Sequence, residues 1–152
     1  MLIGQYLSKI TQKNRISLPK KFRNELGDRV IIAKWYEGCV VIVSESSWEG
    51  ILQKLTGKMN ILTKAVRDTD RFILGSAFEC ELDSQGRFVI PGNLKGYANL
   101  GEDVVFLGLG DRVELWNTKV WNDKEKSVQE NAEITLETLS ARSSGNDEQT
   151  KK

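Results

Sequence analysis

Six cationic side chains concentrated near the N-terminus have the chemistry needed to bind phosphate. They are Lys9, Lys13, Arg15, Lys20, Lys21 and Arg23. Lysine and arginine neutralise nucleic-acid phosphates, and the forked guanidinium can also bond O6 and N7 of guanine. Because a polar turn projects Arg15, we predict that Arg15 reaches a base edge and that the other five cations contact phosphates. A merely solvated charged surface is the alternative for Lys20 and Lys21.

A second arginine, Arg87, lies in an acidic setting that favours a structural role. Glu79, Glu81 and Asp83 surround it in the sequence, where they would repel phosphate and attract the guanidinium. We expect Asp83 to cap its own turn by accepting backbone N–H bonds, with Gly86 in that turn. Arg87→Ala is then predicted to destabilise the fold more than it weakens any DNA contact, whereas Arg15→Ala is predicted to abolish specific DNA binding with little loss of stability.

The distribution of charge separates the two arginines further. Residues 1–34 carry eight Lys or Arg against two acids, a local charge of +6, whereas residues 76–110 carry two against five, a local charge of −3. Such asymmetry suggests that the first region faces a polyanion. The 152 residues include no histidine, and they supply no nucleophile arrangement, metal cluster or phosphate loop. We therefore expect no enzyme activity, no cofactor, no metal and no small-molecule substrate.

The two arginines occupy equivalent places in a duplicated unit. Residues 11–19 match residues 83–91, seventy-two positions later. In each copy Asn14 or Gly86, residue types that tolerate positive φ, precedes the arginine. A short β-forming run follows, and then a proline that suits the first position of a helix. The unit is predicted to contain a turn, an arginine, a strand and a helix.

Alternating and helical patterns place the remaining elements. We expect two β-hairpins in each unit, over residues 5–18, 30–43, 78–90 and 104–116. Apolar residues at helical spacing predict an amphipathic helix over 58–74. The predicted organisation is a basic, DNA-facing first repeat (1–55), a helical linker (56–74), a second repeat (75–126) and a partly helical, then disordered tail (127–152). Disorder is expected beyond about Leu139, where apolar periodicity ends.

The cysteines and the hydropathy of the chain indicate its cellular compartment. Cys39 and Cys80 have no Cys-x-x-Cys spacing, so both are predicted to be free thiols. The apolar runs are far shorter than the roughly 20 residues that span a bilayer. We expect a cytoplasmic protein with no membrane partner.

The duplicated units, the Leu-Gly helix ends and the run Ile-Leu-Gly-Ser-Ala-x-Glu-Cys-x-x-Asp-x-x-Gly-Arg over residues 73–87 resemble the MraZ family, whose members have two SpoVT-AbrB type repeats. The resemblance covers about residues 1–125. The first repeat departs from the family pattern, because Thr11 stands where Asp is usual and Asn14 where Gly is usual, although Arg15 and Pro19 are retained.

This resemblance implies a fold and a function. The implied fold is mainly β with short helices (α+β), in which two AbrB-like repeats form a swapped-hairpin double β-barrel within one chain. The implied function is that of a sequence-specific DNA-binding transcriptional regulator, a repressor of the division and cell-wall gene cluster. It would bind short direct repeats in double-stranded promoter DNA as a ring-shaped homo-oligomer, an octamer or a dodecamer, in the cytoplasm and on the nucleoid.

A different class of function remains open as the alternative. Related AbrB-type folds serve as antitoxins or protein-interaction modules whose flexible tails wrap a partner, and residues 127–152 could be such a tail. The low apolar content of this segment, limited to Ile134, Leu136 and Leu139, argues against a strong anchor.

Overall fold

The computed structural model describes residues 1–57 and 63–150, with the side chains of residues 144–150 left out. The chain divides into two units, Met1–Thr118 and Lys119–Lys152, which are described separately.

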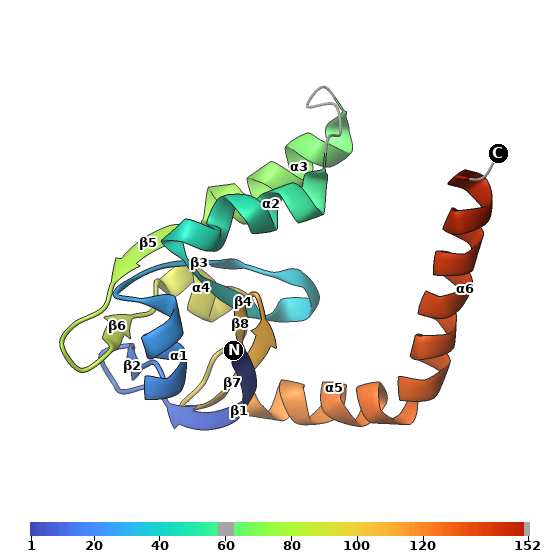
Figure 1. The fold of residues 1–152 in the computed structure, drawn as a ribbon. Coiled ribbons are helices and arrows are strands. Elements are labelled where there is room, and N and C mark those ends of the chain that lie inside the picture. Colours follow the sequence, from blue (N-terminus) through green and yellow to red (C-terminus); the bar gives the residue numbers. More distant parts are fainter. Residues whose placement is uncertain (58–62, 151–152) are drawn as a thin grey trace. The chain divides into compact units, whose positions relative to one another are not determined.

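Within the first unit, both repeats contain the same succession of two strands, a helix and two strands (Figure 1). The first repeat consists of β1 (Leu2–Lys9), β2 (Arg15–Ser17), α1 (Lys20–Leu26), β3 (Arg29–Lys34) and β4 (Val40–Ser44). The second consists of β5 (Phe78–Glu81), β6 (Arg87–Val89), α4 (Gly92–Tyr97), β7 (Asp103–Gly110) and β8 (Val113–Asn117). The predicted duplication is therefore present in the order of the elements.

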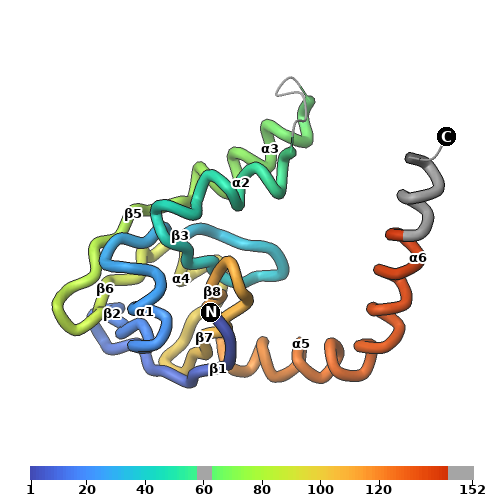
Figure 2. Tube along the Cα trace, viewed as in Figure 1, coloured from blue at the N-terminus to red at the C-terminus, as the bar shows by residue number. Residues whose placement is uncertain are grey.

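Strands of the two repeats interleave in the sheets. Six strands form one antiparallel sheet in the order β1-β7-β8-β4-β3-β5, and β2 pairs with β6 in a separate two-stranded ladder. In Figure 2, β1 in blue lies beside β7 in orange, and the two pair from Leu2 opposite Gly110 to Lys9 opposite Asp103. At the other end of the sheet, β5 of the second repeat pairs with β3 of the first. Each repeat thus completes the sheet of the other.

The hairpins predicted over residues 5–18 and 78–90 are wrong in their strand pairing. The turns form, since the Thr11 backbone N–H donates to the Arg15 carbonyl at 2.9 Å. Among the described strands, however, β1 forms no ladder with β2, and β5 forms none with β6. Alternation along a strand specifies which face is buried but leaves the partner strand open. The hairpins predicted over 30–43 and 104–116 are confirmed as β3–β4 and β7–β8.

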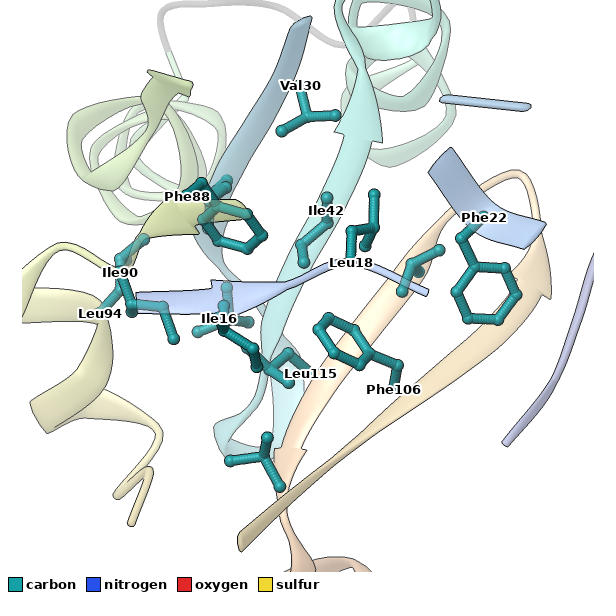
Figure 3. Packing of buried hydrophobic residues seen from close by; sticks show 14 of the residues in the cluster. Ile16, Leu18, Phe22, Val30, Ile42, Phe88, Ile90, Leu94, Phe106 and Leu115 are labelled. Carbon is teal, nitrogen blue, oxygen red and sulfur yellow. The ribbon is translucent and has the colours of Figure 1, made fainter. Parts of the chain in front are cut away.

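One hydrophobic core lies between the ladder, the helices and the large sheet. Ile16 of β2 and Phe88 of β6 pair directly and are both buried, and Phe22 of α1 and Leu94 of α4 are fully buried in the same cluster (Figure 3). The core therefore joins equivalent positions of the two repeats, and burial of these side chains fixes the inward face of the ladder.

Helix α1 begins and ends as its sequence predicts, to within one residue, whereas α4 begins as predicted after Pro91 but ends at Tyr97, before the predicted Leu-Gly end at Leu100. Pro19 and Pro91 lie immediately before the helices, at the N-cap position, where the missing proline N–H leaves no partner unsatisfied. Gly27 ends α1 with φ of 82°, a backbone conformation that glycine adopts without strain.

Helices connect the repeats and follow the second one. Helix α2 spans Trp48–Thr56 and α3 spans Lys64–Ile73, whereas residues 58–62 of the predicted 58–74 helix lie outside the described residues. In the second unit, α5 spans Thr118–Glu130 and α6 spans Ala132–Thr150. Three short 3-10 turns, η1 (Tyr36–Gly38), η2 (Glu45–Ser47) and η3 (Leu74–Ser76), complete the elements.

The C-terminal helices differ from the expectation that the helices are short. The fold is a mixture of helix and strand, but α6 has 19 residues and α5 has 13, so the helices are not all short. Helix α6 extends to Thr150, and the disorder expected beyond about Leu139 stays a prediction.

Across residues 1–57 and 63–150, no helix combines the length and the apolar character that crossing a bilayer requires.

Candidate nucleic-acid interface

The turn before Arg87 is closed by backbone and side-chain bonds. The Asp83 N–H donates to the Arg87 carbonyl at 3.0 Å, and the Gly86 N–H donates to the Asp83 carbonyl at 2.9 Å. The Asp83 carboxylate caps the turn, because Oδ1 accepts the backbone N–H groups of Gln85 and Arg87, both at 2.9 Å. Gly86 has φ of 75°, in the left-handed region. The turn thus has a fixed, carboxylate-capped geometry.

The carboxylate of Asp83 is held in its ionised form. The backbone N–H of Arg87, together with the Arg87 guanidinium and the Gln85 N–H, lowers the pKa of Asp83 to about 2. Arg87 Nε lies 2.8 Å from Asp83 Oδ2, and the two side chains are 39% and 38% exposed. Asp83 is thus the carboxylate that pairs with Arg87, whereas Glu79 and Glu81 are exposed on β5, with Glu81 opposite Arg29.

The turn before Arg15 reproduces this geometry with different residues. The Thr11 N–H donates to the Arg15 carbonyl at 2.9 Å, and the Asn14 N–H donates to the Thr11 carbonyl at 3.0 Å. Thr11 Oγ1 accepts the Arg15 N–H at 3.2 Å, in place of the carboxylate. Asn14 has φ of 58°, which asparagine tolerates better than most residues. The two departures from the family pattern therefore preserve the turn, although a single hydroxyl bond replaces two carboxylate bonds.

The β2–β6 ladder brings the two arginines onto one surface. Arg15 lies opposite Val89 and Ser17 opposite Arg87, while Ile16 and Phe88 face the core. Side chains directly opposite one another in an antiparallel pair point to the same side. The outward side, which we call the ladder face, therefore consists of Arg15, Ser17, Arg87 and Val89.

Arg15 and Arg87 are available on this face to different degrees. Arg15 is exposed, and among the described residues its guanidinium has no ion pair. Arg87 uses Nε for Asp83, and no other described residue bonds its two terminal nitrogens. Sequence analysis predicted separate roles for the two arginines, but in the ladder they are diagonal neighbours, a relation that places residues about 7–8 Å apart in antiparallel pairs.

The predicted lysines fall into two groups. Lys13 lies in the first turn, Lys20 and Lys21 begin α1, and all three are exposed without an ion pair in the described part of the chain. Lys9 is also exposed, but its Nζ lies 3.8 Å from Glu102 Oε1 and 3.6 Å from Asp103 Oδ1. Exposed pairs at such distances contribute little free energy, so Lys9 is only partly neutralised.

Arg23 lies in a different setting from the other predicted contacts. Its Nη2 donates to the Ser84 carbonyl at 2.7 Å, in the turn of the second repeat. Lys95 makes the reciprocal contact, because its Nζ donates to Asn14 Oδ1 at 2.6 Å. Sequence reasoning missed Lys95, although it stands four residues after Pro91, as Arg23 stands four residues after Pro19. Alignment of the repeats beyond the proline would have found it.

Both cysteines are free thiols, as predicted. Burial, followed by the nearby Glu114 carboxylate, raises the pKa of Cys39 far above its usual range. Cys80 is half-buried, and burial raises its pKa too. Neither thiol is activated for chemistry at neutral pH.

Together these features define a class of protein: a tandem-repeat α+β fold whose repeats interleave and present paired arginine turns on one outer ladder. The family model described as "MraZ protein" matches residues 1–72 and again residues 73–143. The chain belongs to the MraZ family, and the resemblance inferred from its motifs is confirmed.

Named relatives extend over most of this chain. A protein of Thermoanaerobacter pseudethanolicus called "Transcriptional regulator MraZ" is 42% identical over 137 residues, covering 88% of this chain and 95% of its own. Relatives with the same name from Caldanaerobacter subterraneus and Halothermothrix orenii are both 39% identical, over 139 and 133 residues. They cover 91% and 88% of this chain, and 96% and 92% of their own lengths.

Proposed function

We propose that this protein is a sequence-specific DNA-binding transcriptional regulator that docks the ladder face and its two turns on duplex DNA. The observation that carries the proposal is the position of Arg15 and Arg87 on one outward side of a two-stranded ladder. The major groove of B-DNA admits a two-stranded β-ribbon, and arginine bonds guanine bidentately there. The expected spacing of about 7–8 Å corresponds to roughly two base-pair steps of 3.4 Å.

Phosphate contacts supply the remaining affinity. The exposed lysines Lys13, Lys20 and Lys21 flank the ladder in sequence and have no ion pair within the described residues to break on binding. Lys9 joins them after releasing weak contacts to Glu102 and Asp103. Arg23, engaged with the second turn, is reassigned from phosphate contact to support of that turn.

Self-assembly belongs to the same proposal. Three residue pairs of ladder give one protomer too small a reading surface, so several protomers bind adjacent direct repeats in promoter DNA. We propose a swapped-hairpin double β-barrel within each chain and a ring of such chains, an octamer or a dodecamer. The open outer edges of β1 and β5, and the exposed apolar side chains of Ile3, Leu7 and Leu109, support association between copies.

The biological setting follows the family resemblance. We propose repression of the division and cell-wall gene cluster, in the cytoplasm and on the nucleoid, by a protein that is not an enzyme and that needs no cofactor or small-molecule substrate. The relatives are called transcriptional regulators, and the absence of histidine from the sequence removes the commonest general base.

A protein-interaction role, such as that of an antitoxin, is the weaker candidate. The family description adds a likeness to antitoxins, and Ile134, Leu136 and Leu139 of α6 are each at least 60% exposed. Residues two apart on a helix do not face the same way, so Ile134 lies off the face that Leu136 and Leu139 share, and two leucines make a small anchor. DNA binding is therefore preferred.

Selection from random duplex DNA at physiological salt tests the proposed function. The protein should enrich a short motif that contains guanines and recurs at regular spacing. Gel shifts should then give a much lower Kd on that motif than on its scrambled version. Recovery of no motif, with equal affinity for both duplexes, would refute sequence-specific binding.

A further inference from the structure

Two charged side chains cross between the repeats and bond the turns of the ladder. Lys95 of α4 donates from Nζ to Asn14 Oδ1 at 2.6 Å, and Arg23 of α1 donates from Nη2 to the Ser84 carbonyl at 2.7 Å. Each cation therefore bonds the turn that precedes the arginine of the other repeat. We call these two contacts the cross-repeat clamps.

Backbone bonds converge on the same two turns. The Leu18 N–H donates to the Gly86 carbonyl at 2.9 Å, and the Ile90 N–H donates to the Asn14 carbonyl at 2.8 Å. Each turn is therefore bonded by the other repeat in addition to the bonds within the turn itself. The side-chain clamp adds a second point of attachment to each turn.

The Arg23 side chain packs closely against Gly86. A Cβ atom at Gly86 would lie 2.8 Å from Arg23 Cδ, well inside van der Waals contact. The Arg23 side chain therefore lies directly on the backbone of the turn, and its charged end is turned toward Ser84. Arg23 and Lys95 are both partly buried, unlike the exposed Lys13, Lys20 and Lys21.

We propose that Lys95 and Arg23 are positioning residues, which hold the two turns in the conformation that binds DNA and make no phosphate contact themselves. This inference rests on the proposed function of the ladder face. Asn14 directly precedes Arg15, so a clamp on the Asn14 side chain restricts the direction in which the guanidinium projects. Restricting a turn before binding lowers the entropy that is lost on binding.

Salt dependence separates positioning from phosphate contact. Lys95→Met keeps most of the apolar stem, and it should weaken binding to the selected motif roughly twofold to tenfold. The slope of log K against log salt should stay unchanged, because no counterion release is lost. Lys20→Met is the matched positive control, and it should lower the magnitude of that slope by about 0.9 for each protomer that contacts DNA. A reduction of the same size in Lys95→Met would assign Lys95 to the phosphates and overturn the proposal.

A double-mutant cycle tests whether Lys95 acts through Asn14. Asn14→Gly removes the acceptor but keeps a residue that adopts positive φ readily. Lys95→Met should have no further effect on affinity in the Asn14→Gly background. Lys95→Arg, made in the parent, should keep most of the affinity that Lys95→Met loses. Additive losses would mean that Lys95 acts elsewhere, and unchanged affinity in both single variants would also overturn the clamp.

Hydrogen exchange in the free protein tests the clamp without DNA. Lys95→Met should speed exchange of the Asn14 and Arg15 amides, which bond Thr11, while the β3–β4 amides keep their protection. Unchanged exchange at Asn14 and Arg15 would refute the clamp. If Lys95→Met does not fold, the same measurement on Asn14→Gly decides. Failure of the parent to bind any duplex refutes the proposed function instead, so the two failures are distinguishable.

Discussion

The two arginines of the ladder face should contribute comparably to DNA recognition. Arg15→Ala and Arg87→Ala each delete a guanidinium from the same outward surface. A bidentate arginine–guanine contact discriminates by about 1–3 kcal/mol, or roughly 5-fold to 150-fold in Kd for each protomer engaged. We expect each variant to weaken binding to the selected motif by at least about fivefold, and the loss to grow with the number of protomers bound.

Neither variant should unfold the protein. Arg15 is exposed and has no ion pair among the described residues, so its loss removes no folded-state contact of consequence. Arg87 pairs with Asp83, but Asp83 keeps its bonds from the Gln85 and Arg87 backbone after truncation. Glu79 is exposed as well. Arg87→Ala therefore leaves no group of buried carboxylates without a cation, and it should not destabilise the fold. Both variants should melt within a few degrees of the parent.

Gel shifts on the selected and scrambled duplexes, together with thermal melts, measure both quantities. Arg71→Ala is the matched control, because Arg71 of α3 pairs with Asp68 at 2.8 Å much as Arg87 pairs with Asp83. It should change neither DNA affinity nor specificity. If Arg87→Ala binds like the parent while Arg15→Ala does not, the second repeat only supports the fold, and the shared ladder face is wrong.

Three further outcomes are expected. With roughly 6 to 10 phosphate contacts per complex, affinity should fall by about 10³ to 10⁵ between 50 and 200 mM salt, and a flat salt profile would contradict the basic surface. Light scattering at micromolar concentration should give a mass several times that of one chain, and Leu7→Glu, at a side chain that is 80% exposed, should lower it; a monomeric parent would count against the ring. The pKa of Asp83 is about 2 in the folded protein and about 3.9 in the unfolded chain, so the stabilisation by this carboxylate is present above about pH 4 and is lost as pH falls through about 2. In Asp83→Asn the melting temperature should therefore depend less on pH between those values. A pH profile identical to that of the parent would exclude Asp83 as its cause.

Local chemistry was predictable wherever neighbouring residues determine it. The Asn14 and Gly86 turns, the buried Phe22 and the Gly27 helix end all follow from conformational preference and spacing over a few residues. The pairing of β1 with β7 and of β5 with β3 did not follow, because strands with similar alternation can pair with any partner that buries the same face. Once β2 pairs with β6, Arg15 and Arg87 share a surface, and this could not be deduced from their separate neighbourhoods.

The candidate site was predictable in composition but only partly in arrangement. Charge density identified Arg15, Lys13, Lys20 and Lys21, whose exposure is consistent with a surface role. The same criterion included Arg23, which the fold directs toward Ser84. A long cationic side chain reaches several ångströms, so its sequence position does not specify whether it points to solvent or to a neighbouring turn.

The two turns of the ladder are capped by different groups. The second turn has a carboxylate cap that accepts two N–H bonds at 2.9 Å, whereas the Thr11 hydroxyl accepts one at 3.2 Å. A carboxylate at Thr11 would cap more strongly, but it would place a negative charge beside Lys13 and Arg15, where the proposed function requires phosphate to approach. The weaker neutral cap thus keeps the first turn electropositive, and the bond from Lys95 to Asn14 supplies order that the cap alone does not provide. Because that lysine comes from the second repeat, and β6 completes the ladder, the proposed DNA-binding geometry of Arg15 would require both repeats to be folded together.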